Sequence, residues 1–361
     1  MPAKFKTIMN IRQILLGILF CQTLSASLLA ADPVPEVRVS NIRRVFHNGE
    51  HNAFTDLCQF QGKYYLTFRS CPQGHMVHPT SSILVLVSDD LKNWEQVHRF
   101  NVPLRDTRDP HFLIFQEKLF IYTGTWYCGE TSPKTYDMNQ QLGYAVWSND
   151  GKEWSRPQML EGTYGHYIWR AATHDGKAYL CGRHKVNFQE DGGKRNRQAT
   201  VSTMLESDDG LKWRANSYFQ TEWGDETAFL FEADGSVIAV ARKSSNPAQL
   251  CKSKFPFNEW TRESLGRFIG GPLLAKWNGH SLVGGRKSLS GKQPVTALYW
   301  LVDDELQEIV ELPSGGDNSY PGFIEVSPNK GIVSWYSSHE KNEQGETITA
   351  IYLADLEIVN P

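Results

Sequence analysis

Three heptads with one pattern recur along the chain: Ser-Asp-Asp-Leu-Lys-Asn-Trp at residues 88–94, Ser-Asn-Asp-Gly-Lys-Glu-Trp at 148–154 and Ser-Asp-Asp-Gly-Leu-Lys-Trp at 207–213. Their first residues lie 60 and 59 positions apart, and each heptad follows an apolar stretch. Asp and Gly adopt turn geometry at low cost, and Ser and Asp side chains bond nearby backbone N–H groups. Three copies at a steady spacing therefore predict a repeat of tight β-hairpins, each closed by a Trp.

Six pairs of apolar stretches, each pair joined by a short turn, interleave with the heptads. They are residues 54–60 and 64–68, 112–115 and 119–122, 168–173 and 178–181, 228–231 and 237–241, 272–277 and 281–283, and 322–326 and 331–335. Four of the turns carry hairpin dipeptides such as Asp175-Gly176 and Asn278-Gly279. Six copies predict an all-β fold, a six-bladed β-propeller of four-stranded antiparallel blades, and residues 37–46 read as a strand that closes the ring with the last blade.

Composition supports this fold and excludes some partners. The chain has 361 residues, of which 40% are hydrophobic and 12% aromatic. Aromatic rings pack well on pleated sheets and offer apolar faces to sugars. The formal net charge of -3 gives no basic footprint, so no nucleic-acid partner is expected. We expect a monomer and no cofactor or metal.

The first 31 residues read as a cleaved signal peptide. Lys4, Lys6 and Arg12 precede an apolar run over residues 14–31 that ends in small residues. An uncleaved membrane anchor is the alternative. We expect residues 32–361 to form one propeller domain, secreted or periplasmic, without a membrane span after signal cleavage. Five cysteines remain after cleavage, an odd number that leaves at least one thiol unpaired.

The repeat predicts which residues share one rim of the ring. In each blade the first strand leaves that rim and the second strand returns to it, so the start of one lies beside the end of the other. Four second strands end in arginine: Arg69, Arg183, Arg242 and Arg286. First strands begin with Asp56, Arg108-Asp109-Pro110, Trp169-Arg170, Asp225-Glu226, Gly270-Gly271-Pro272 and Ser319-Tyr320-Pro321. Clustered guanidinium groups suit a substrate carboxylate, although single arginines could instead join blades through Asp56, Asp109 or Asp225. The heptads fall on the opposite rim, where we expect a structural role.

The chain resembles the sialidase superfamily, because its heptads are similar to the Asp-box (BNR) repeats of that family. The resemblance implies that Tyr320 is the nucleophile, that Glu226 assists it, and that Arg242 and Arg286 hold the sugar carboxylate. These four residues follow one another at spacings of 16, 44 and 34 positions, which fit the family. A core tyrosine at a strand start is the alternative for Tyr320. Phenol has a pKa of about 10, so a tyrosine nucleophile needs a neighbouring base.

The first blade departs from the family pattern. Sialidases carry Arg-Ile-Pro there, whereas this chain has Ala53-Phe54-Thr55. A third carboxylate-binding arginine would have to be Arg69, Arg108 or Arg170. The family's general acid is an aspartate in the loop after the second strand, but residues 70–79 contain no carboxylate. The candidates for that proton donor are His75, His78 and Asp56.

We expect a secreted sialidase-like exo-glycosidase that acts on terminal acidic sugars of glycans with retention. Two alternatives stay open. In the first, the substrate differs. Arg108-Asp109-Pro110 resembles a signature of five-bladed fructosidase-like and arabinanase-like glycosidases, which would make Asp109 a transition-state stabiliser and Glu226 the acid. A uronate-containing polysaccharide would also use the arginine cluster, as the substrate of a glycosidase or of a lyase with Tyr320 and a histidine. The other alternative is a non-catalytic carbohydrate-binding propeller. A hydrogen bond between Tyr320 and Glu226 would distinguish an enzyme from a non-catalytic binding protein.

Overall fold

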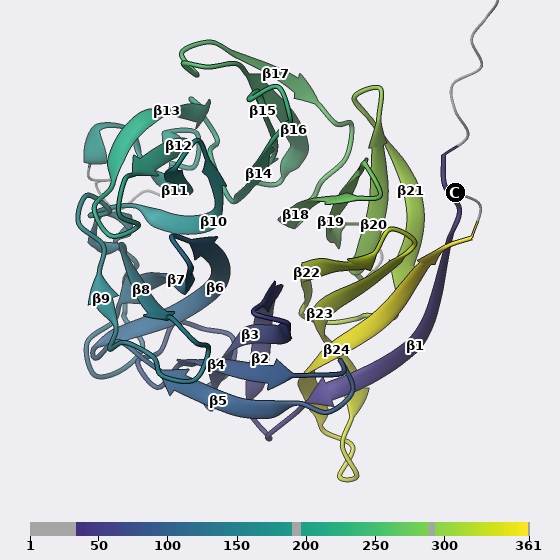
Figure 1. Ribbon diagram of the computed structural model, residues 1–361. Helices are drawn as coiled ribbons and strands as arrows, with labels where there is room; N and C mark the ends of the chain where they lie inside the picture. The colour runs from purple at the N-terminus through teal and green to yellow at the C-terminus, as the bar shows by residue number, and fades with distance from the viewer. Residues whose placement is uncertain (1–33, 190–195, 289–292, 360–361) are drawn as a thin grey trace, which may run out of the picture. The chain divides into compact units, whose positions relative to one another are not determined.

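The structure is a computed structural model that describes residues 34–189, 196–288 and 293–359. Six four-stranded antiparallel sheets are arranged as blades around a ring, which confirms the predicted all-β six-bladed propeller (Figure 1). Two single turns of 3₁₀-helix, Met138–Gln140 and Val186–Phe188, are the helical elements in these ranges. The predicted signal peptide lies outside the described residues. No helix within the described ranges has the length and apolarity needed to cross a membrane.

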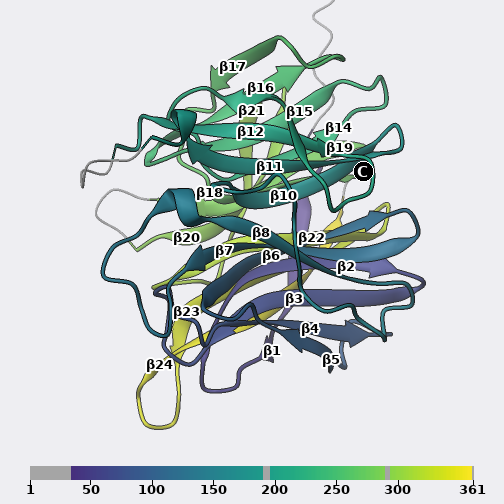
Figure 2. The ribbon, with the colours of Figure 1, turned by 90° about the vertical axis from the view of Figure 1, so that its left-hand side faces the viewer.

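Each blade runs outward from its first strand. The first blade contains β2 (His51–Phe60), β3 (Lys63–Cys71), β4 (Ser82–Ser88) and β5 (Glu95–Phe100), and the second β6 (Arg105–Phe115), β7 (Lys118–Tyr127), β8 (Leu142–Ser148) and β9 (Gln158–Met159). The third contains β10 (Tyr167–His174), β11 (Lys177–Lys185), β12 (Thr200–Ser207) and β13 (Arg214–Gln220), and the fourth β14 (Thr227–Phe231), β15 (Val237–Lys243), β16 (Asn246–Ser253) and β17 (Trp260–Ser264). The fifth contains β18 (Gly270–Trp277), β19 (His280–Lys287), β20 (Val295–Val302) and β21 (Glu305–Leu312). Figure 2 shows the first three blades following one another up the side of the ring.

The sixth blade is built from both ends of the described chain. It contains β22 (Asn318–Ser327), β23 (Lys330–Lys341), β24 (Thr347–Ile358) and, on the outside, β1 (Val37–Phe46). Strand β1 pairs antiparallel with β24, with Val37 opposite Ile358. The prediction that residues 37–46 close the ring is therefore confirmed. The closure covers an edge of β24 that would otherwise be open to pairing with another chain.

The heptads are the turns between the third and fourth strands of the first three blades, as predicted. In the first, the Ser88 hydroxyl accepts a hydrogen bond from the backbone N–H of Leu91 at 2.8 Å. Asp90 Oδ1 accepts from the backbone N–H groups of Lys92 and Asn93 at 2.9 and 2.8 Å. The same bonds recur in the heptads that begin at Ser148 and Ser207. The repeat therefore encodes local hydrogen bonding that needs no contact from elsewhere.

The hydrophobic core lies between blades. One cluster joins Phe120 and Tyr122 of the second blade to Leu180 and Leu205 of the third, with the heptad residue Trp213 among them. Apolar burial of this kind is what holds successive sheets together. The five cysteines of the described chain, Cys58, Cys71, Cys128, Cys181 and Cys251, are all free thiols. The odd number of cysteines required at least one unpaired thiol, and in the structure all five are unpaired.

Candidate functional site

The innermost strands break their pairing register where they begin. The breaks lie at residues 53–56 in β2, 108–111 in β6, 168–171 in β10, 270–273 in β18 and 319–322 in β22. Phe54, Asp109, Gly271 and Tyr320, one at each of four breaks, have positive φ angles. In the fourth blade, Asp225-Glu226 stands directly before β14. Bulges re-aim side chains next to active sites, and here they turn the predicted rim dipeptides toward one another.

Tyr320 and Glu226 form the centre of this group. The Tyr320 hydroxyl donates a hydrogen bond of 2.9 Å to Oε1 of Glu226. The other oxygen, Oε2, accepts from Nη1 of Arg242 at 2.8 Å and from the backbone N–H of Gly271 at 3.0 Å. Both residues are buried. Burial, and then the Glu226 carboxylate, raise the pKa of Tyr320 well above its usual value, so the free protein holds a neutral phenol against a base.

Two arginines flank the tyrosine. Nη1 of Arg242 lies 3.4 Å from the Tyr320 hydroxyl, and the guanidinium carbon of Arg286 lies 5.5 Å from the centre of the Tyr320 ring. Their side chains are 20% and 23% exposed, so both can be reached from solvent. The structure thus brings together the four residues that the resemblance singled out: Tyr320, Glu226, Arg242 and Arg286.

The other three predicted arginines have internal partners. Arg69 is fully enclosed and bonds the Asp106 carboxylate and the carbonyls of Gly74 and Met76. Arg108 also pairs with Asp106, and it donates to the carbonyl of His75 at 2.8 Å. These two arginines therefore anchor the loop between β3 and β4 within the protein.

Arg170 joins blades. Its Nη1 bonds Oδ1 of Asp56 at 2.9 Å, its Nε bonds the carbonyl of Pro272 at 3.0 Å, and its Nη2 bonds the carbonyl of Pro321 at 2.6 Å. The third blade is tied in this way to the first, fifth and sixth, which is the bridging alternative considered for single arginines. Asp56 also accepts from the backbone N–H of Phe112 at 2.9 Å. Burial acts to raise the pKa of Asp56, but the Arg170 guanidinium and these hydrogen bonds lower it. Asp56 is therefore an ionised link between blades and not a proton donor.

Asp109 is the one predicted carboxyl of the site that is protonated at neutral pH. Burial raises its pKa to about 8, against the lowering effect of Arg108, and the Glu226 carboxylate adds to the increase. Its Oδ1 is buried and has no hydrogen-bond partner within the described ranges. A protonated carboxyl at this place can donate a hydrogen bond to a ligand.

Asp225, beside Glu226, lies between two arginines. It pairs with Nη1 of Arg183 and lies 3.5 Å from Nε of Arg242. Burial acts to raise the pKa of Asp225, but Arg242 and Arg183 outweigh it and hold the carboxyl ionised. Asp225 therefore fixes Arg242 in the position from which it contacts Glu226 and Tyr320.

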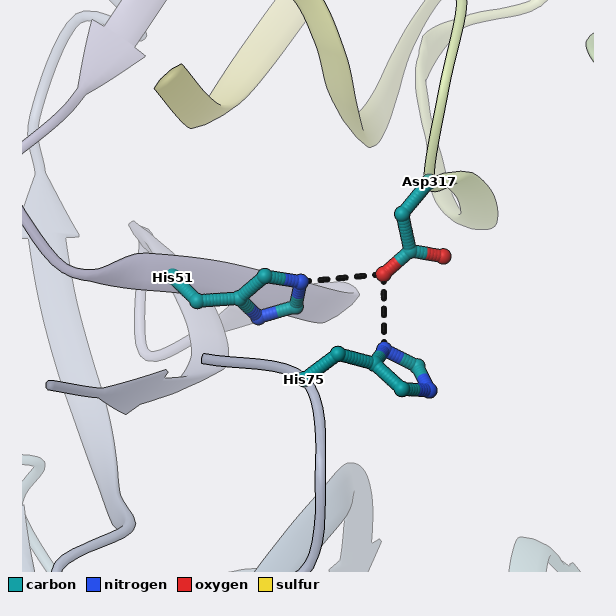
Figure 3. A group of neighbouring side chains, drawn as sticks. All are labelled: His51, His75 and Asp317. Carbon is teal, nitrogen blue, oxygen red and sulfur yellow. Dashed lines mark hydrogen bonds and ion pairs between the residues drawn. The ribbon is translucent and has the colours of Figure 1, made fainter. Parts of the chain in front are cut away.

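A second cluster adjoins the tyrosine on the side of the first blade (Figure 3). Oδ2 of Asp317 accepts from Nε2 of His51 at 2.9 Å and from Nδ1 of His75 at 2.7 Å. Its Oδ1 accepts from Nη2 of Arg286 and from the Tyr336 hydroxyl, each at 2.9 Å. Burial opposes ionisation, yet the two histidines and Arg286 hold the pKa of Asp317 well below its usual range.

Residues of these types can also ligate a metal, since the ligand atoms of His51, His75 and Asp317 lie within 4.8 Å of one another. Both histidines already share one carboxylate oxygen, and the cationic Arg286 occupies the other. We therefore interpret the cluster as a hydrogen-bond network. Sequence reasoning missed Asp317, His51 and Tyr336. The position of Asp317, three residues before Tyr320, was the available signal, but its pairing with the first blade is not written in the sequence.

The comparisons with known proteins agree with this fold. No protein-family model matches the chain, and no curated protein matches it. Among solved structures it is similar to a protein of unknown function from Dyadobacter fermentans, with a TM-score of 0.75 and 20% identity over 90% of this chain and 100% of that chain. It is also similar to Trypanosoma rangeli sialidase in complex with sialic acid, with a TM-score of 0.63 and 12% identity over 91% of this chain and 59% of that one.

A further similar structure is NanB sialidase from Streptococcus pneumoniae, with a TM-score of 0.63 and 12% identity over 88% of this chain and 70% of that chain. The chain spans little more than half of the trypanosomal enzyme. At these identities the likeness establishes the fold. The chain thus has a six-bladed β-propeller fold similar to that of these sialidases.

Proposed function

We propose that this protein is a sialidase-like exo-glycosidase that removes terminal acidic sugars from glycans with retention. The observation that carries the proposal is the buried hydrogen bond of 2.9 Å from the Tyr320 hydroxyl to Glu226. A binding protein has no need of a base against a phenol, whereas a tyrosine nucleophile requires one. The sialidase-like fold of the chain supports the same class of reaction.

In the proposed reaction Glu226 accepts the phenolic proton as the Tyr320 oxygen attacks the anomeric carbon. The glycosidic bond breaks, the leaving oxygen takes a proton from an acid, and the sugar is held on Tyr320 until water releases it. A neutral phenol suits a substrate that carries a negative charge, since a carboxylate nucleophile would be repelled by it. Arg242, in contact with both Glu226 and the Tyr320 hydroxyl, would stabilise the oxygen as it loses its proton.

The substrate carboxylate would bind between Arg242 and Arg286. Both guanidinium groups are partly exposed and lie against Tyr320, Arg242 at its hydroxyl and Arg286 over its ring, so a carboxylate beside the anomeric carbon can reach them. Asp109, protonated at neutral pH, would donate to a sugar hydroxyl. We further propose export and signal cleavage near residue 31, on the support of the N-terminal sequence, and a monomer as the active form.

The runner-up keeps the Tyr320–Glu226 pair and changes the sugar. Where the family has Arg-Ile-Pro, the first blade has Ala53-Phe54-Thr55, and the ring centre of Phe54 lies 5.0 Å from that of Tyr320. Without that guanidinium, Arg242 and Arg286 are the two proposed partners for a carboxylate on the anomeric carbon. This favours, as the alternative substrate, an acidic sugar that carries its carboxylate elsewhere on the ring, such as a uronic acid.

The experiment measures the hydrolysis of four fluorogenic glycosides: a sialoside, a glucuronide, a galacturonide and a neutral glucoside. Each is tested with the purified mature protein and with its Tyr320→Phe and Glu226→Gln variants. Turnover of the sialoside that collapses in both variants supports the proposal. Turnover of only a uronide that depends on the same pair supports the runner-up. If the folded protein hydrolyses no member of the panel, the proposed exo-glycosidase is rejected.

A further inference from the structure

We propose that His75, held by Asp317, is the group that protonates the leaving sugar oxygen. The inference rests on the proposed glycosidase function and identifies the acid which that reaction requires. It rests on the position of the histidine, on the contacts that fix it, and on the charge, bonding or burial that makes the other candidates less suited.

The loop between β3 and β4 places His75 rigidly. The carbonyls of Gly74 and Met76 each accept from Arg69 at 3.1 Å, and the carbonyl of His75 itself accepts from Arg108 at 2.8 Å. Three consecutive peptide units are thus bound by two arginines, both of which pair with Asp106. A loop with this many charge-assisted bonds can hold a side chain to the tolerance that catalysis needs.

The imidazole ring has one bound and one open nitrogen. Nδ1 bonds Asp317 at 2.7 Å, and Figure 3 shows Nε2 turned away from both Asp317 and His51. The side chain is 45% exposed, in contrast to 10% for His51. A carboxylate on one nitrogen fixes the orientation of the ring, and Nε2 is then the nitrogen that can exchange a proton with a substrate.

The His75 ring packs against Phe54, which in turn packs against Tyr320, the proposed nucleophile. Its centre lies 5.8 Å from that of Phe54, which in turn lies 5.0 Å from that of Tyr320. Asp317 connects the two groups a second time, because it also bonds Arg286, whose guanidinium lies over the Tyr320 ring. A leaving sugar directed toward solvent past Phe54 would therefore meet Nε2 of His75.

The other candidates are less suited to this step. Asp56 is ionised and tied to Arg170. Burial lowers the pKa of His51, which keeps that ring neutral. Nδ1 of His78 is bonded to the hydroxyl of Thr80, a neighbour in its own loop, at 2.8 Å. Asp109 is protonated but only 4% exposed, a position that fits the sugar ring better than the departing group.

The proton balance closes over two steps. As the Tyr320 oxygen bonds to the anomeric carbon, its proton passes to Glu226, the glycosidic C–O bond breaks, and the leaving oxygen takes the proton of Nε2. In the second step neutral His75 takes a proton from water, the water oxygen bonds to the anomeric carbon, and Tyr320 departs and recovers its proton from Glu226. The charged side chains around His75 are Asp317, which it contacts, Arg108, which bonds its carbonyl, and Arg69 and Arg286, which bond the adjacent carbonyls and Asp317 respectively.

The test compares two substrates of the same acidic sugar, one with an aryl leaving group (a 4-methylumbelliferyl glycoside) and one with a sugar as leaving group. An aryl oxide departs without protonation, whereas a sugar alkoxide does not. We expect His75→Ala to lower kcat/KM for the sugar-linked substrate by about 100-fold or more, and for the aryl glycoside by less than about 10-fold. His75→Gln, which keeps a donor for Asp317 but cannot titrate, should behave as His75→Ala and lose the basic limb of the pH profile.

The outcomes separate this inference from the proposed function. Tyr320→Phe should lower the turnover of both substrates equally. If the wild-type protein hydrolyses neither, the proposed function fails and the inference with it. If the wild type hydrolyses both and His75→Ala changes neither, or changes both equally, His75 is not the acid. Strong dependence on the leaving group in His78→Ala or Asp109→Asn instead would likewise overturn the assignment.

Discussion

The hydroxyl of Tyr320 lies 2.9 Å from Oε1 of Glu226, although 94 positions separate the two residues in the chain. One stands at the start of the sixth blade and the other directly before the first strand of the fourth. Gly271, from the fifth blade between them, bonds the second oxygen of Glu226 through its backbone N–H. Three blades thus meet in one acid–base pair, and the predictions below follow from how that pair is held.

Substitution of Glu226, the proposed base, should lower kcat more than it weakens substrate binding. We expect Glu226→Gln to lower kcat by about 10²- to 10⁴-fold with a small change in KM, because an amide cannot accept the phenolic proton. Glu232→Gln is the matched control, since Glu232 follows the other end of β14 and pairs with Lys276. Steady-state kinetics on the preferred acidic glycoside make the measurement. A normal kcat for Glu226→Gln would contradict the role of Glu226 as base.

Gly271 should tolerate no side chain. Its φ angle is +58°, and a Cβ atom there would lie 2.5 Å from Cγ of Tyr320. We expect Gly271→Ala to displace the tyrosine ring and to lower kcat by at least about 10²-fold. Gly279→Ala provides the control, because Gly279 has a φ of +79° in the turn of the same blade but no atom within 4 Å of a Cβ. Equal losses of activity in the two variants would show that backbone strain, and not the contact with Tyr320, is responsible.

Arg170 should be essential to the stability of the ring. Arg170→Ala leaves the Asp56 charge buried without its partner and frees the carbonyls of Pro272 and Pro321. We expect a loss of about 3–5 kcal/mol in the free energy of unfolding. Arg38→Ala removes an exposed pair with Glu357, and a change within about 0.5 kcal/mol is expected. Urea unfolding measures both. A loss below about 1 kcal/mol for Arg170→Ala would contradict the assigned role of Arg170 between blades.

Asp109 should make the protein less stable as the pH rises through neutrality. Its pKa is about 8 in the folded state, so the folded protein keeps a proton that the unfolded chain has already lost. The contribution of this group to the free energy of unfolding therefore falls as the pH rises to 8, by about 1 kcal/mol between pH 7 and pH 8. In this interval most histidines have already lost their proton and the thiols still keep theirs. In Asp109→Asn this fall should shrink and the free energy of unfolding at pH 8 should increase. Urea unfolding at the two pH values is the measurement, and an unchanged slope in the variant would contradict the protonated state.

The sequence predicted the blades because their signals are local. The Ser-Asp turns satisfy their own backbone groups, as Ser88 and Asp90 show, and the paired apolar stretches recur with the spacing of one hairpin. The strands are longer than the apolar stretches that predicted them, most clearly in β6, where the stretch over residues 112–115 is the end of a strand that begins at Arg105. The register break at residues 108–111 explains the difference, because it interrupts the apolar pattern without ending the strand.

The sequence by itself determined the number of blades, the rim on which chemistry could gather, and four residues that the structure places together: Tyr320, Glu226, Arg242 and Arg286. Only the tertiary structure decided how each of these polar groups is paired within the protein. It gave Arg69, Arg108 and Arg170 internal partners, left Asp109 protonated, and joined Asp317 to His75 across blades. The reason is physical. Strand pairing follows local patterns of side chains, whereas the charge state and partners of a buried group depend on every residue that the ring brings to the axis from distant parts of the chain.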